Sequence, residues 1–116
     1  MVARQVAIMP RAARRYDIYL PLTYNDGRLI ADELFRVVQR RLLGRFGGVT
    51  AQQQESPLQG MWQSGGRVYH DQVIVMTALD FHRHGSTRFI AELKHALLAD
   101  FEQLDILITE QSLRVH

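Results

Sequence analysis

Residues 68–79 read Val-Tyr-His-Asp-Gln-Val-Ile-Val-Met-Thr-Ala-Leu and form the longest strand-like run of the chain. The second half of this run, Val73-Ile74-Val75-Met76, is apolar at consecutive positions, whereas the first half carries His70, Asp71 and Gln72. Consecutive side chains of a strand point to opposite faces of a sheet, so a continuous apolar run predicts a strand that is covered on both faces. The run therefore predicts the central strand of the fold.

The segments on either side of this run predict the rest of the fold. Before it lie an alternating run at Tyr16–Leu22, a helical pattern at Arg28–Leu43 and a short polar strand at Val49–Gln54. After it lie a second helical pattern at Thr87–Leu104 and an apolar run at Ile106–Ile108, which Ser112–His116 could extend. The order β-α-β-β-α-β predicts an α+β domain with a ferredoxin-like four-stranded antiparallel sheet, in strand order 4-1-3-2, and two helices on one face.

Apolar spacing identifies the residues that we expect in the core, and turn residues mark the expected helix ends. Asp26 is placed to cap the first helix and Gly44 to end it. The apolar positions recur at strand or helix spacing. They are Tyr16, Ile18, Leu20 and Leu22 in the first strand, Ile30, Leu34, Val37, Val38 and Leu42 in the first helix, and Phe89, Ile90, Leu93, Leu97, Phe101 and Leu104 in the second.

Charge and composition divide the 116 residues into a basic tail, residues 1–15, and one domain, residues 16–116. The tail holds four of the 14 basic residues and no acid, so the remaining 101 residues hold 10 basic and 12 acidic groups. The high isoelectric point therefore belongs largely to a tail that we expect to be flexible, and not to a basic binding face. Cysteine is absent, which excludes disulfides and is consistent with a cytoplasmic protein. No stretch is long enough for a membrane span.

The doubly apolar half of the central strand also predicts self-association. Two helices can cover only one face of such a sheet, so the other face needs a different cover. A second copy of the chain is the simplest one. We expect a homodimer or higher oligomer with Tyr19, Val73, Val75 and Leu107 near the interface.

The order of glycine, aromatic and turn residues along the chain resembles that of a family of small uncharacterised bacterial domains with a β-α-β-β-α-β pattern. The resemblance covers about residues 16–108 and implies the fold without supplying an activity. The chain has Asp71 where that family usually has Glu, and its Phe-to-Thr spacing differs by one residue. The matching segments are Asp26-Gly27, Phe46-Gly47-Gly48-Val49-Thr50, Gly60-Met61-Trp62, Gly66, Asp71 and Phe101-Glu102-Gln103.

The start of the central strand is the candidate ligand-binding site. Alternation puts Arg67, Tyr69 and Asp71 on one face and His70 on the other, and Trp62, the one tryptophan, lies just before them between glycines. Beside Asp17 and Tyr19 of the first strand, this group would have acid–base capacity. The alternatives are a packing role for Trp62 and a hydrogen-bonding rim of an oligomer interface.

Other motifs give weaker indications. His82 and His84 have a spacing that can share a metal ion, but a third ligand is needed, for which Asp80, His70 or His116 are available. Arginines at the end of the first helix are best read as a solvated face. The segment 66–71 lacks the aromatic pattern of RNA-binding sheets, so nucleic acid is not an expected partner. There is no phosphate-binding or dinucleotide-binding loop, and no cofactor is expected.

Two functions remain open at the level of the sequence. The first is a non-catalytic, oligomeric ligand-binding or interaction module. The second is an enzyme that uses no cofactor, like the small dimeric ferredoxin-like monooxygenases and isomerases, whose open sheet faces shelter a substrate. The second hypothesis rests on analogy of fold and requires a concave pocket that holds a titratable group with a perturbed pKa.

Overall fold

The computed structural model describes residues 9–116, and its longest strand is β4 (Arg67–Asp80), as the sequence predicts. Strand β1 (Arg11–Pro21) pairs antiparallel with the second half of β4, with Pro21 opposite Val73 and Arg14 opposite Asp80. Strand β5 (Ile108–Val115) pairs with the free edge of β1. The second half of β4 is therefore an inner strand of the sheet.

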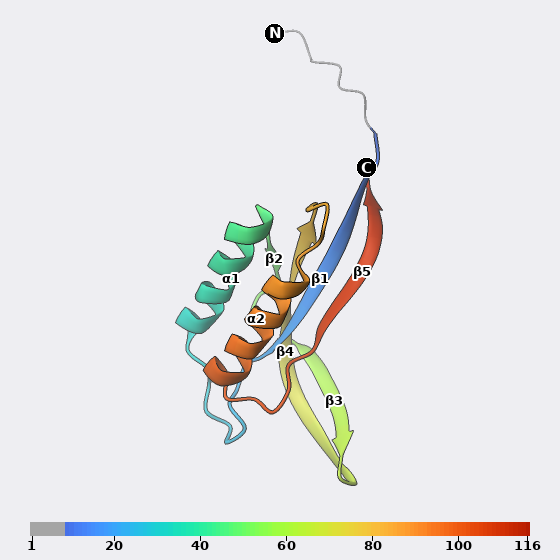
Figure 1. The fold of residues 1–116 in the computed structure, drawn as a ribbon. Coiled ribbons are helices and arrows are strands. Elements are labelled where there is room, and N and C mark those ends of the chain that lie inside the picture. Colours follow the sequence, from blue (N-terminus) through green and yellow to red (C-terminus); the bar gives the residue numbers. More distant parts are fainter. Residues whose placement is uncertain (1–8) are drawn as a thin grey trace.

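Two short strands share the other edge of β4. β2 (Thr50–Ala51) lies opposite Met76 and Thr77, and β3 (Leu58–Ser64) pairs with residues 67–73. The described chain thus forms a five-stranded antiparallel sheet in the order β2-β4-β1-β5, with β3 added to β4. Figure 1 shows the β3–β4 hairpin extending past the helices at one end of the molecule.

Helices α1 (Asp32–Phe46) and α2 (Thr87–Asp100) lie on one side of this sheet, as expected (Figure 1). Alternate residues of β1 and β4 point toward them and are buried, and the helices contribute one apolar stripe each. The first strand therefore buries the positions predicted for it, and the second half of β4 buries Ile74, Met76 and Ala78. The largest members of this core are Tyr16, Ile18, Leu20, Phe35, Leu42, Ile74, Met76, Leu93, Leu97 and Phe101.

The prediction of four strands is wrong, because the predicted edge strand Val49–Gln54 pairs with β4 only at Thr50 and Ala51. After Ala51, the side-chain amide of Gln52 donates to the carbonyl of Ser56, and the chain turns at residues 54–56. Residues Leu58–Ser64, which were not predicted as a strand, then resume pairing with β4. The edge is divided because the polar segment between β2 and β3 leaves the ladder.

Both terminal strands are longer than predicted. β1 begins at Arg11 and not at Tyr16, so Arg11–Arg15 belong to the sheet and not to a flexible tail. Their partners are Gln111–Val115 of β5, which extends the predicted last strand toward the C-terminus. Residues 1–8 of the expected tail lie outside the described residues.

The helix ends also differ from the prediction. α1 begins at Asp32 because Leu29 bridges Thr23, and Asp26 accepts hydrogen bonds from Arg28 instead of capping the helix. Gly47, and not Gly44, ends α1 in the left-handed conformation, with φ 78°.

The core stripes of the helices differ from the prediction at a few positions. Phe35 is buried in place of Leu34 and Val37, which are only half-buried. α2 ends at Asp100, so Leu104 is exposed and takes no part in the core.

The face of the sheet opposite the helices carries the odd-numbered residues of β1 and β4. Tyr19, Val73 and Val75 lie side by side there and are half-buried, and Leu107 follows at the edge with 56% exposure. Asp17 accepts a hydrogen bond from Thr77 on the same face, 2.6 Å long. In the part of the chain that the structure describes, no helix covers this face (Figure 1).

Candidate functional site

The β3–β4 hairpin is built by a two-glycine turn. Gly65 and Gly66 both have positive φ, 57° and 77°, which is the backbone of a tight hairpin turn and is strained for other residues. The turn places Ser64 opposite Arg67 and fixes the register of the hairpin formed by β3 and residues 67–73 of β4, which we call the arm. In this register Trp62 lies directly opposite Tyr69, and Gly60 opposite Asp71.

Three of the four predicted site residues come together on one face of this arm. The Trp62 and Tyr69 rings stack with their centroids 4.4 Å apart and their planes 15° from parallel. The indole Nε1–H of Trp62 donates a hydrogen bond of 2.7 Å to Oδ2 of Asp71. Because Gly60 has no side chain, the position across from Asp71 is open to the indole. We call Trp62, Tyr69 and Asp71 the hairpin cluster.

The hairpin cluster is exposed, although large aromatic residues usually serve packing. Trp62 is 45% exposed and Tyr69 is 38% exposed. Each ring covers one face of the other, and neither belongs to the hydrophobic core. The arm thus presents an aromatic surface and a carboxylate without a packing role in the described chain.

Arg67, the fourth predicted residue, lies at the tip of the arm, two positions beyond Tyr69. Among the described residues it forms no ion pair with Asp71, so Arg67 does not join the contacts of the other three residues. The expectation that Asp17 and Tyr19 complete the site is wrong. They pair with Thr77 and Val75, and β1 ends opposite Val73, before the arm begins.

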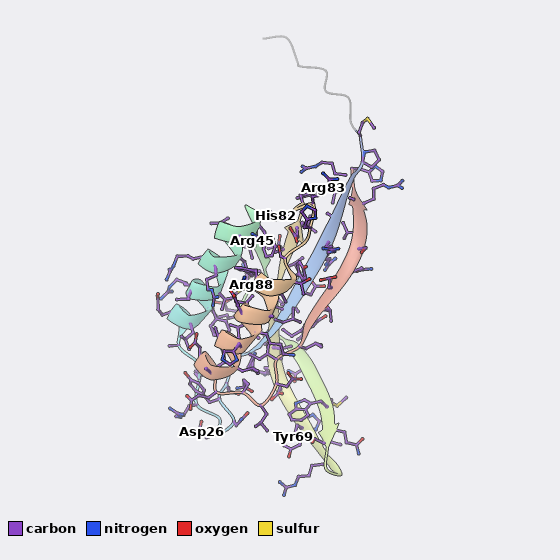
Figure 2. All side chains as sticks on the ribbon, viewed as in Figure 1. Asp26, Arg45, Tyr69, His82, Arg83 and Arg88 are labelled. Atoms are coloured by element: carbon purple, nitrogen blue, oxygen red, sulfur yellow. The ribbon has the colours of Figure 1, made fainter. Side chains whose placement is uncertain are left out.

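His82 and His84 follow the other end of β4, and Figure 2 shows His82 there. The His82 ring is hydrogen-bonded to Asp80, with Nδ1 2.6 Å from Oδ1. In residues 9–116 no three histidine or acidic side chains are grouped as metal ligands. The spacing of these histidines therefore does not assemble a metal centre in the described chain.

Two surface depressions are hollowed elsewhere on the described part of the molecule. The smaller, of about 260 Å³, lies between α1 and the segment after β2 and includes Gln52–Glu55. The larger, of about 900 Å³, lies on the open face near Phe46, Phe81 and Leu113. Neither depression includes the hairpin cluster. The cluster would therefore contact a ligand on the open surface of the arm, unless a second molecule packs against it.

Sequence reasoning missed the pairing of Asp80 with His82, although it named both residues. Asp80 occupies a core-facing position in the series Ile74, Met76, Ala78, and its side chain is fully buried. An acid inside an apolar alternation was the available signal, because a buried carboxylate requires partners. The pairing itself depends on how the chain turns after the strand, which periodicity does not report.

Comparisons with solved structures find the same arrangement in other proteins. A phage SAM lyase in complex with S-methyl-5'-thioadenosine matches with a TM-score of 0.61 and 14% identity, covering 99% of this chain and 95% of that one. The phage SAM lyase in its apo state gives 0.60 and 11%, covering 98% and 95%. A divalent cation tolerance protein, CutA1 from Thermus thermophilus, gives 0.57 and 16%, covering 85% and 82%.

At 11–16% identity these likenesses describe the fold. Residues 9–116 form an α+β arrangement of two helices and a five-stranded antiparallel sheet, and their fold is similar to that of these structures. No protein-family model matches the sequence, and no curated protein is significantly similar to it. None of the helices in residues 9–116 has the length and apolar character that crossing a bilayer requires.

Proposed function

We propose that the protein is a self-associating ligand-binding domain that recognises a flat, positively charged small molecule with its hairpin cluster. The observation that carries this proposal is the stacked, exposed Trp62–Tyr69 pair, with Asp71 hydrogen-bonded to the indole. Aromatic faces attract cations and flat rings, and a carboxylate beside them supplies the complementary charge. The rings have no place in the core that would otherwise account for them.

The open sheet face supports self-association as the second part of the proposal. Val73, Val75 and Tyr19 form an apolar strip there that no helix of the described chain covers. A second copy seated on this strip would also bring a surface near the base of the arm. As a further part of the proposal, the fold is a ferredoxin-like arrangement in which the second strand is divided into β2 and β3.

A thermal-shift screen of metabolites and divalent metals, read together with Trp62 emission, tests the proposal. Trp62 is the one tryptophan, so its emission reports on the arm without a label. A ligand of the hairpin cluster raises the melting temperature, changes the emission and loses affinity in Asp71→Asn and Trp62→Ala. A ligand that stabilises the protein without changing the emission, and that binds both variants normally, would place the site elsewhere.

A second candidate function is a lyase that acts on S-adenosylmethionine. Its support is the likeness to a phage SAM lyase over nearly the whole chain, together with a carboxylate and aromatic rings suited to a sulfonium cation. This narrows the cofactor-free enzyme hypothesis to one reaction class. Incubation with S-adenosylmethionine should release S-methyl-5'-thioadenosine if the candidate is correct. Absence of that product, with binding retained, would leave the ligand-binding function alone.

A further inference from the structure

The end of β4 opposite the arm holds a buried carboxylate that positions a histidine. Oδ1 of Asp80 accepts hydrogen bonds from the backbone N–H of His82, at 2.9 Å, and from its ring Nδ1, at 2.6 Å. Burial alone would raise the pKa of Asp80, but the hydrogen bonds from the backbone and ring of His82 outweigh it and lower the pKa below its ordinary value. Asp80 is therefore an ionised acceptor, and Nδ1 of His82 is the donor.

This hydrogen bond fixes which ring nitrogen of His82 is available. In neutral imidazole one nitrogen donates and the other accepts, so donation from Nδ1 leaves the lone pair on Nε2. The His82 side chain is 45% exposed, and its ring meets the ring of Phe46 edge-on at 6.4 Å. A carboxylate that orients a histidine in this way is the arrangement that general-base catalysis uses.

Two buried oxygen atoms in the same corner have no hydrogen-bond partner among the described residues. They are Oδ2 of Asp80 and the hydroxyl of Tyr16, which sits at the neighbouring core position of β1, opposite Ala78. Burial, with the nearby carboxylates of Glu110 and Asp80, raises the pKa of Tyr16 to about 12, so the phenol keeps its proton. A buried oxygen without a hydrogen-bond partner is unfavourable, because it has lost its contacts with water. The corner therefore has unused donor and acceptor capacity beside His82.

Arginines surround this corner. The Arg45 guanidinium donates from Nε to Ser86 Oγ, at 3.0 Å, and from a terminal nitrogen to the carbonyl of Gly85, at 3.2 Å. The Arg14 guanidinium packs so closely on Gly85 that a Cβ there would lie 1.7 Å from its nitrogen. Arg83 adjoins His82 and is exposed. Figure 2 shows Arg45, His82 and Arg83 gathered at the end of the molecule opposite Tyr69.

Acidic groups only partly balance these cations. Glu110 of β5 lies 3.8 Å from Arg14, and Asp80 is engaged by His82. Among the described residues Arg83 forms no ion pair, and it directly follows His82 in the exposed turn after β4. A cation next to an oriented base selects a substrate that carries an anionic group.

We propose that Asp80 and His82 form a proton-transfer dyad in a second site, which binds a small molecule carrying a carboxylate or phosphate group. Arg83 pairs with the anionic group. Nε2 of His82 takes a proton from an O–H or N–H group of the substrate, while Nδ1–H stays bonded to Asp80. The imidazolium then returns the proton to the group that becomes basic, so no oxidant, reductant or metal enters the step. This site is independent of the hairpin cluster.

The test is ¹H–¹⁵N NMR of the histidine rings in the wild-type chain, followed by titration with inorganic phosphate as the probe. We expect His82 to be the Nδ1–H tautomer, and phosphate to shift its Nε2 resonance. Arg83→Ala should weaken phosphate binding about tenfold, the loss expected for one charge-assisted hydrogen bond. His84→Ala, which alters an exposed histidine two positions away, should leave both results unchanged.

Asp80→Asn supplies a further measurement if that variant folds. It should convert His82 to a mixture of tautomers, because the asparagine amide can accept from Nδ1–H through its oxygen or donate to an unprotonated Nδ1 through its NH2 group. An Nε2–H tautomer in the wild-type protein would overturn the dyad. Phosphate shifts that are equal at His82 and His84, or that persist unchanged in Arg83→Ala, would overturn the anion site. Both readouts of the wild-type protein remain valid should Asp80→Asn fail to fold.

Discussion

The two halves of strand β4 share one backbone ladder but have opposite surroundings. Residues 73–80 have β1 on one side and the short strand β2 on the other, and their even-numbered side chains are buried under the helices. Residues 67–72 pair with β3, apart from one backbone hydrogen bond that Leu22 donates to Gln72, and their side chains are exposed or half-buried. The inner half is explained by packing. The outer half carries aromatic rings that packing does not explain, so it is the half in which to look for binding.

The largest expected difference between the halves is in stability. Met76 is fully buried in the inner half, and Met76→Ala should lower the free energy of unfolding by about 3 kcal/mol through lost burial and a cavity. Val68 is 58% exposed in the outer half, and Val68→Ala should change it by less than about 0.5 kcal/mol. Urea unfolding of the two variants measures both values. Equal losses would mean that the arm is packed against something in solution.

The second difference concerns self-association. Val75→Asp places a charge in the centre of the apolar strip on the open face, and it should weaken association about 100-fold. Val68→Asp introduces the same charge on the arm, on the face opposite to the hairpin cluster, and serves as the control. Light scattering over a dilution series measures the mass of each. A wild-type protein that is monomeric at tens of micromolar would contradict the association through this face.

A third prediction uses Tyr16, which faces the helices beside the inner half of β4. Its pKa is raised to about 12 by burial and by nearby carboxylates, whereas the unfolded chain has the ordinary value of about 10. Because the folded pKa is the higher one, this contribution to stability is complete below about pH 10 and is lost as the pH rises to about 12. The loss should be roughly 3 kcal/mol, because each of the two pKa units corresponds to about 1.4 kcal/mol.

Tyr16→Phe is the matched control for this pH dependence. The hydroxyl has no hydrogen-bond partner among the described residues, so the variant should unfold within about 1 kcal/mol of the wild type at pH 7. Between about pH 10 and 12 its stability should no longer fall by the amount that Tyr16 contributes. Urea unfolding measured by circular dichroism gives the free energy of unfolding of both proteins at each pH. If both lose the same stability between about pH 10 and 12, the pH dependence belongs to groups other than Tyr16.

The sequence predicted the inner half of the sheet well because burial there repeats with the period of the strand. Ile18 and Leu20 in β1 are buried, and the alternation correctly placed both on the face under the helices. It failed where backbone geometry decides. The helical pattern continues to Leu104, but α2 ends at Asp100, where Glu102 adopts φ 50°. Apolar spacing carries no information about such a turn.

The candidate sites divide in the same way. Alternation predicted that Tyr69 and Asp71 share one face, and the glycines placed Trp62 close to them in sequence. The pairing of Leu58–Ser64 with β4, which sets Trp62 opposite Tyr69, was not predicted, because turn residues alone do not fix a strand register. The stacking and the indole–carboxylate hydrogen bond could not be predicted, since they depend on side-chain rotamers. The Asp80–His82 pair was likewise hidden, because it forms across a turn outside the regular ladder.

The most direct test of the central claim, that the hairpin cluster binds a ligand, is a titration with S-adenosylmethionine followed by Trp62 emission. We predict that Trp62 emission of the wild-type protein changes saturably with S-adenosylmethionine, and that Asp71→Asn binds about tenfold more weakly. Without ligand, Asp71→Asn should have the same melting temperature as the wild type, which shows that the lost affinity is not a loss of folding. Asp100→Asn, an exposed acid at the end of α2, should bind like the wild type. An emission that never changes, or equal affinity in Asp71→Asn, would contradict the account.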